Sequence, residues 1–169
     1  MADVMRYNSW DRNFKAPFGA LKISQNATIK VKVNKNFNVY SIKLIIEKED
    51  ENLKPVIVRE LDLKQVSEYN DIREYSVEIA PLQTPAVYYY FFVVELNIYG
   101  EDRTLFYGKT HNNGMACEYT YENLNKYQLT VYEDYKVPSW FKEGILYHVF
   151  VDRFNNGNRN GKVDNPKKN

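Results

Sequence analysis

The stretch Thr28-Ile-Lys-Val-Lys-Val33 alternates apolar and polar side chains without a break. Successive side chains of a β-strand point to opposite faces of its sheet. The stretch therefore predicts a half-buried strand, with Ile29, Val31 and Val33 facing a core and the two lysines facing solvent.

Strand patterns recur at short intervals after this stretch, separated by turns rich in Asn, Asp, Gly and Pro. They cover 41–47, 55–61, 73–79, 87–96, 103–107 and 128–132, which gives about seven strands. The range 87–96 is apolar on both faces and predicts the central strand of a sheet. The best candidate for a short helical turn is 61–69. Regularly spaced strands without long helices predict an all-β sandwich of two sheets.

Length and charge exclude several classes of protein. The chain has 169 residues, which suits one domain of ordinary size with or without a tail. A complete (β/α)8 barrel needs roughly 250 residues and does not fit. The formal net charge is +1, with Lys and Glu interspersed, so we expect no nucleic-acid partner.

Targeting signals and cysteine usage indicate a location. The first residues show no apolar segment of a secretory signal, and the longest apolar run, 86–94, is far too short to span a membrane. The single cysteine, Cys117, has no partner for an intramolecular disulfide, which suits a reducing compartment. We expect a soluble cytoplasmic protein with no membrane partner.

The C-terminal part carries a different pattern. From Ile145 to Val151 the chain is apolar without alternation, which is typical of a strand covered on both faces in a parallel sheet or barrel. The run ends in Asp152-Arg-Phe154 and a loop rich in Asn and Gly. Strand ends of this kind are where parallel folds place their sites.

Both ends of the chain resemble parts of one enzyme family. Tyr147-His-Val-Phe-Val-Asp-Arg-Phe154, followed by Asn156-Gly-Asn158, resembles the first barrel strand of the α-amylase family (glycoside hydrolase family 13). The similarity is to its neopullulanase, cyclomaltodextrinase and α-glycosidase branch, although His148 and Val151 replace the usual Gln and Pro. Pro138-Ser-Trp140 resembles the Pro-x-Trp before that strand. The segment 7–20 resembles the opening of the immunoglobulin-like N-terminal domain of the same enzymes.

This resemblance implies a domain plan. Residues 1–134 would form the immunoglobulin-like N-terminal domain, 135–143 a linker, and 144–169 the incomplete start of the catalytic (β/α)8 barrel. The parent enzyme would hydrolyse α-glucosidic bonds by a retaining mechanism with two carboxyl groups. The family's catalytic Asp, Glu and Asp lie on later strands, so we expect the chain alone to be inactive. In this branch the N-terminal domain also tends to contribute to dimerisation and to sugar binding, which makes a homodimer a candidate assembly.

Tyrosine is the compositional outlier, with fifteen residues beside nine Phe. One explanation is a β-rich core, because aromatic residues suit pleated, half-buried surfaces. The other is binding of an α-glucan or maltooligosaccharide, because flat rings stack on pyranose faces. Trp10 is either an exposed stacking residue or a buried anchor. Trp10, Tyr88 and Tyr90 are our candidates for weak sugar binding.

The loop after the apolar run has the spacing of a calcium site. Asn156, Asn158, Asn160 and Asp164 occupy positions 1, 3, 5 and 9 of an EF-hand-type loop, with Gly161 at the sixth. The twelfth position is Lys167, where an EF-hand needs a bidentate Glu. The resembled enzymes hold a structural calcium in this loop, whereas the alternative is a plain Asn/Gly turn.

Two other classes of function stay open. One is a stand-alone carbohydrate-binding module without catalysis, and the other is a purely structural sandwich. An open reading frame that continues past Asn169 into the acidic motifs of the family would favour the hydrolase over both.

Overall fold

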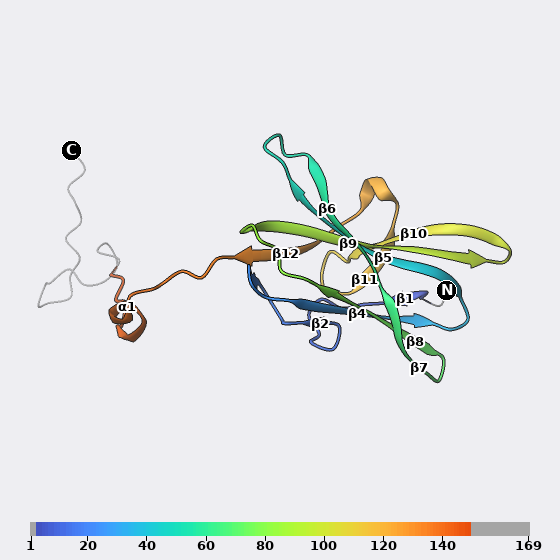
Figure 1. Ribbon diagram of the computed structural model, residues 1–169, viewed down its shortest axis with the longest axis horizontal. Helices are drawn as coiled ribbons and strands as arrows, with labels where there is room; N and C mark the ends of the chain where they lie inside the picture. The colour runs from blue at the N-terminus through green and yellow to red at the C-terminus, as the bar shows by residue number, and fades with distance from the viewer. Residues whose placement is uncertain (1–2, 150–169) are drawn as a thin grey trace, which may run out of the picture. The chain divides into compact units, whose positions relative to one another are not determined.

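The computed structural model describes residues 3–149 of the chain, and this part is nearly all β (Figure 1). The strands are β1 (Met5–Arg6), β2 (Lys15–Ala16), β3 (Leu21–Lys22), β4 (Ala27–Asn34), β5 (Asn38–Glu49), β6 (Pro55–Asp62), β7 (Lys64–Tyr69), β8 (Ile72–Ile79), β9 (Ala86–Ile98), β10 (Glu101–Lys109), β11 (Ala116–Tyr119) and β12 (Tyr127–Tyr132). Within 3–149 the helical elements are a 3₁₀ turn, η1 (Tyr121–Asn123), and one short helix, α1 (Ser139–Glu143).

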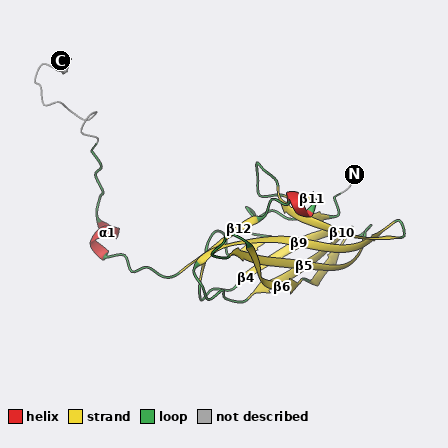
Figure 2. Ribbon diagram, turned by 90° about the horizontal axis from the view of Figure 1, so that it is seen from above, coloured by secondary structure: helices red, strands yellow, loops and turns green. Residues whose placement is uncertain are grey.

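The strands form two sheets that share one core, as the predicted sandwich requires (Figure 2). One sheet contains β1, β2, β4, β7 and β8, and the other contains β3, β5, β6 and β9 to β12. Strand β9 is central, as predicted, because it pairs with β5, β10 and β12. These three pairings are antiparallel, and β12 pairs in parallel with β3.

The alternating stretch lies in β4 and behaves as predicted. Ile29, Val31 and Val33 are fully buried, whereas the lysines between them are half-buried on the other face. Burial of side chains of this size contributes roughly 1.5–3 kcal/mol each relative to exposure. Strand β4 pairs with β8 over its whole length, and Tyr75, Val77 and Ile79 of β8 pack on the core as predicted.

Five aromatic rings pack in the core between the two sheets. Tyr90 of β9 stacks on Tyr127 of β12, with ring centroids 4.9 Å apart. Tyr7, directly after β1, meets Tyr127 and Phe92 edge-on at 5.1 and 4.9 Å. Phe14 completes the group at 6.0 Å from Tyr7. Such edge-on and stacked pairs contribute about 0.5–1.5 kcal/mol beyond the area that they bury.

The helical turn predicted at 61–69 is wrong, because this range contains the end of β6 and all of β7. Leu61 and Leu63 lie two residues apart, so a strand places both on the core side. The amide of Leu63 donates to the carbonyl of Ile42 at 2.8 Å. A strand thus explains the apolar spacing that suggested a helix.

The chain divides between Asp134 and Tyr135 into two compact units. The second unit contains α1, where the sequence predicts an irregular linker; five residues are too few to show a helical period. The barrel strand predicted from Ile145 onward is not seen in 145–149, where Ile145 and Leu146 are exposed. Its remaining residues lie outside the described range. Within 3–149, no helix has the length and hydropathy needed to cross a membrane.

We predict that alkaline pH destabilises the first unit. Burial raises the pKa of Tyr7, Tyr90, Tyr107 and Tyr127 in the folded state above the value of about 10 for unfolded tyrosine. Each such group contributes stability that is present below pH 10 and is lost as the pH rises further. The free energy of unfolding should fall by about 1.4 kcal/mol per pH unit for each buried tyrosine.

Circular dichroism and absorbance at 295 nm, followed together from pH 9 to 12, measure this effect. Part of the tyrosinate signal should form only as the β signal is lost. Tyr99→Phe removes a fully exposed hydroxyl and should leave the unfolding pH unchanged. Ionisation of all fifteen tyrosines with an intact β signal would contradict the prediction.

Candidate functional site

The segment from Asn8 to Ala20, here called the Trp10 loop, begins with two tight turns. The amide of Trp10 donates to Asn8 Oδ1 at 3.0 Å, and the amide of Asn13 donates to Asp11 Oδ1 at 2.8 Å. Asn and Asp favour such turns because their short side chains accept from the backbone two residues on. These bonds fix the course of the backbone on both sides of Trp10.

Gly114 anchors this loop to the strand β11 region. The amide of Ser9 donates to the Gly114 carbonyl at 2.9 Å, next to a bridge between Asn8 and Met115. A Cβ atom at Gly114 would lie 2.6 Å from Asn8 Oδ1, 2.7 Å from Ser9 Oγ and 2.8 Å from Trp10 Cδ1. Only glycine fits this contact without displacing these three side chains.

The side chain of Lys15 binds the backbone of the same loop at Pro17 and Gly19. The side chain is buried, and its ammonium donates to the carbonyls of Gly19 at 2.7 Å and Pro17 at 3.3 Å. Burial lowers the pKa of Lys15. An ammonium has three N–H donors, so one remains after these two bonds. The ammonium thereby fixes the turn on both sides of Phe18.

A groove of about 300 Å³, here called the Trp10 groove, lies beside this loop. Its lining residues are Ser9, Trp10, Lys15, Phe18, Gly19, Ala20, Tyr90, Gln128 and Thr130. Trp10 is 60% exposed and Phe18 53%, so two flat apolar rings lie at the surface beside hydroxyl, amide and ammonium groups. Apolar walls with a few polar groups are typical of small-molecule sites.

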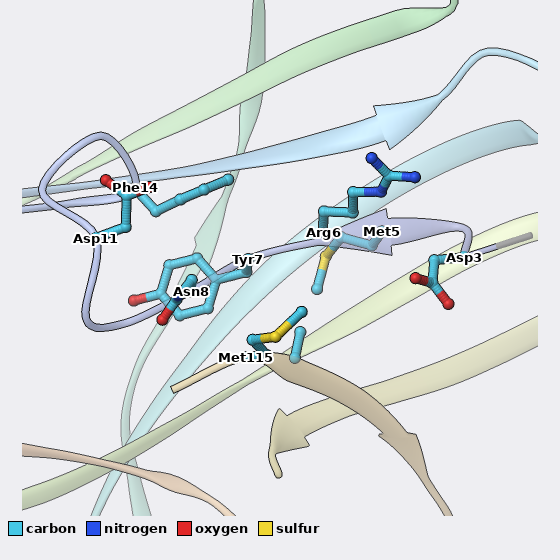
Figure 3. A pocket seen from close by; sticks show the side chains of 9 residues that line it. Asp3, Met5, Arg6, Tyr7, Asn8, Asp11, Phe14 and Met115 are labelled. Carbon is cyan, nitrogen blue, oxygen red and sulfur yellow. The ribbon is translucent and has the colours of Figure 1, made fainter. Parts of the chain in front are cut away.

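Other residues of the same loop line a second hollow, of about 340 Å³ (Figure 3). Its lining residues are Asp3, Met5, Arg6, Tyr7, Asn8, Asp11, Phe14, Met115 and Ala116. Two carboxylates, one guanidinium and two thioethers dominate it, and its aromatic rings are buried or half-buried. This lining suits stacking on a sugar less well than the Trp10 groove does.

The two hollows meet through a buried hydrogen bond. Tyr7 lines one hollow and Tyr90 the other, and their hydroxyl oxygens lie 2.8 Å apart. Two hydroxyls carry two protons, and their mutual bond uses one of them. The second proton can serve a water or a ligand.

The predicted sugar-binding residues separate in the structure. Trp10 is exposed, which favours its stacking role over the buried anchor. Tyr88 and Tyr90 are 2% and 1% exposed, so their rings offer no face to a sugar, and this corrects the expectation of accessible rings. Both point into the core, where the Tyr88 hydroxyl donates to the Thr84 carbonyl at 2.9 Å. Phe18 was missed, although an aromatic within Pro17-Phe-Gly19 signals an exposed turn.

The predicted calcium ligands, Asn156, Asn158, Asn160 and Asp164, lie outside the described residues, so this site stays a prediction. Among residues 3–149, no group of three or more His, Cys, Asp or Glu side chains could hold a metal ion.

We predict that Gly114→Ala disturbs the Trp10 loop. The added methyl overlaps three atoms of the loop and should lower the free energy of unfolding by about 1–3 kcal/mol. Urea unfolding measures this, and tryptophan emission in a Trp140→Phe background reports on Trp10 alone, because the chain has two tryptophans. Asn112→Ala, at an exposed position of the same turn, is the control. Unchanged stability and emission in Gly114→Ala would show that the contact is not tight.

Comparison with known proteins gives relatives for nearly the whole chain. No family model matches it. An amylopullulanase of Thermoanaerobacterium thermosulfurigenes is 24% identical over 159 residues, which are 92% of this chain and 8% of that protein. An amylopullulanase of Thermoanaerobacterium saccharolyticum is also 24% identical, over 92% of this chain and 12% of that protein. A third, from Thermoanaerobacter thermohydrosulfuricus, is 28% identical over 92% of this chain and 10% of that protein.

The chain therefore spans only about a tenth of the length of these relatives. Among solved structures, a cyclomaltodextrinase matches 84% of this chain and 22% of its own, with a TM-score of 0.42 and 14% identity. The similarity to one segment of the amylopullulanases extends over both the first unit and most of the second.

Proposed function

We propose that this chain is a non-catalytic N-terminal β-domain of a larger hydrolase that acts on α-glucans. The observation that carries the proposal is the similarity of 92% of the chain to proteins named amylopullulanase, of which it spans about a tenth. A segment that small leaves the catalytic residues to the remainder of the enzyme. The sandwich adds support, because the sequence resembles an N-terminal domain of this class.

The finer assignments belong to the same proposal. They are an immunoglobulin-like topology for the sandwich, a linker after Asp134 and the start of a catalytic barrel at its end. A homodimer through this domain and a reducing, cytoplasmic location are included, the latter because Cys117 is exposed and free.

The domain's own task in this proposal is to hold a glucan chain near the catalytic part. The Trp10 groove supplies what such a task needs, namely two exposed rings for pyranose faces and polar groups for hydroxyls. The groove is small and open, so we expect weak binding, with a Kd on the order of 1 mM, or about −4 kcal/mol.

A stand-alone carbohydrate-binding module is the second candidate. It is favoured by one observation: all residues of the Trp10 groove lie in the first unit. A purely structural sandwich is the outcome if no sugar binds.

We predict that the Trp10 groove binds maltoheptaose. In a Trp140→Phe background, the sugar should shift the emission of Trp10 saturably. Phe18→Ala should weaken binding about fivefold, through loss of about 1 kcal/mol of apolar contact. Tyr135→Ala removes a ring that lies outside the groove and is even more exposed than Phe18, and it is the control. Equal affinities for Phe18→Ala and the control would exclude the groove.

We also predict that the purified chain has no glycosidase activity. A retaining glycosidase needs two carboxyl groups about 5 Å apart across one glycosidic bond. In this proposal both belong to the rest of the enzyme, so incubation with pullulan, starch or β-cyclodextrin should release no reducing sugar. A version extended past Asn169 through the remaining reading frame should release it. Turnover by the chain alone would overturn the proposal.

A further inference from the structure

We propose that a hollow around Tyr89 is a second saccharide-binding site, separate from the Trp10 groove. The hollow measures about 410 Å³ and is lined by Glu47, Glu49, Pro55, Tyr89, Leu124, Asn125 and Lys126. Tyr90 is buried in the core, and successive side chains of a strand point to opposite faces. Tyr89 therefore lies on the outer face of β9, away from the core.

A buried carboxylate lies beside this ring. Glu47 of β5 is 3% exposed and stands directly opposite Tyr89 in the register of β5 and β9. Its Oε1 accepts a hydrogen bond from the ammonium of Lys126. No other hydrogen bond to this carboxylate occurs within the described part of the chain. Removing an ion from water costs several kcal/mol unless its hydrogen-bonding capacity is met.

No buried side-chain oxygen of the described residues lacks a hydrogen-bond partner, so the second carboxylate oxygen is one that solvent in the hollow reaches. An ionised carboxylate accepts through both oxygens and donates through neither. A sugar hydroxyl in the hollow would take the place of water at this oxygen. The pair formed by the buried Glu47 and the half-buried Lys126 thus leaves one acceptor open to a ligand.

The hollow also contains a hydrogen-bond donor, the ammonium of Lys126. The Lys126 ammonium lies 5.6 Å from the ring centroid of Phe91 and keeps N–H donors beyond the one bound to Glu47. Sugar hydroxyls both donate and accept, so a carboxylate beside an ammonium matches two neighbouring hydroxyls. The half-buried ring of Tyr89 offers an apolar surface next to them.

The lining is held in place without a ligand. Asn125 Nδ2 donates to the Lys109 carbonyl at 2.7 Å, and the Lys109 amide donates to the Asn125 carbonyl at 2.7 Å. A Cβ at Gly108 would lie 2.3 Å from that carbonyl oxygen, so β10 needs a glycine to admit this segment. Groups fixed before binding cost less entropy to order when a ligand arrives.

Charge selects the ligand class. Glu47 and Glu49 against Lys126 leave the hollow with a formal charge of −1, which disfavours anions. The described residues offer no cluster of three acidic, His or Cys side chains for a metal ion. A neutral, hydroxyl-rich ring fits best. The choice of an α-glucan as probe rests on the proposed function. The lining of the hollow shares no residue with that of the Trp10 groove.

The test is a ¹⁵N–¹H correlation titration of the full chain with maltoheptaose. Amides of 47–49, 89 and 124–126 should shift in the wild type, and should shift with the same Kd in Trp10→Ala. Tyr89→Val keeps a good strand residue and should weaken these shifts at least tenfold, while those of the Trp10 groove persist. Glu47→Gln keeps the side-chain shape and should weaken them about fivefold. Tyr132→Val, at an exposed position of β12, is the matched control.

Three outcomes overturn this inference. Chemical-shift changes confined to the Trp10 groove would exclude the second site and leave the proposed function intact. Loss of the shifts around Tyr89 in Trp10→Ala would show that the two hollows form one site. Shifts at neither place remove the second site and the sugar-binding role together. If Tyr89→Val fails to fold, Glu47→Gln alone decides, because an unchanged Kd in that variant contradicts the role of the carboxylate.

Discussion

The hydrogen bond between the Tyr7 and Tyr90 hydroxyls is the constraint that ties the N-terminal segment of this sandwich to its central strand. The two oxygens lie 2.8 Å apart inside the core, where an unpaired hydroxyl would cost about 1–3 kcal/mol. Tyr90 belongs to the central strand, whereas Tyr7 lies in the N-terminal segment, which has little regular structure of its own. The bond thus fixes the N-terminal segment against β9. Because Asn8 follows Tyr7 directly, it also fixes where the Trp10 loop begins.

The alternation of β9 then divides its three consecutive tyrosines between two roles. Tyr88 and Tyr90 are buried and supply ring area and hydroxyl pairs to the core. Tyr89 lies on the other face, beside Glu47 and Lys126. Of the two explanations that the composition suggested, the structure supports a β-rich core for Tyr88 and Tyr90, whereas sugar binding at Tyr89 belongs to the proposal above. Tyr88 and Tyr90 on the inner face are explained by burial, and Tyr89 on the outer face lines the second hollow.

The sequence predicted the parts of the fold whose pattern is local. The strand at 28–33 shows period-two alternation because one face is buried, whereas in 41–47 the alternation ends at Leu44, since residues 44–47 are all buried. β1, β2 and β3 have two residues each, which is too short for any period, and pairing with distant strands defines them. The strand β9 is apolar on both faces, so its pattern does not tell which face lies inside. The sequence therefore does not reveal that Tyr88 and Tyr90, two of the candidates for sugar binding, are buried. Trp10 packs close to Gly114, more than a hundred residues away in the chain, and no local signal reveals this contact.

The two candidate sites draw on neighbouring residues of paired strands, because Gln128, which lines the Trp10 groove, stands opposite Tyr89, which lines the second hollow. β9 pairs with β5 on one side and with β10 and β12 on the other, so its adjacent tyrosines cannot move independently of the sheet. Linked weak sites gain avidity only where a ligand can engage both at once. A glucan chain that contacts both hollows would gain avidity in this way, whereas a chain that contacts only one of them would not.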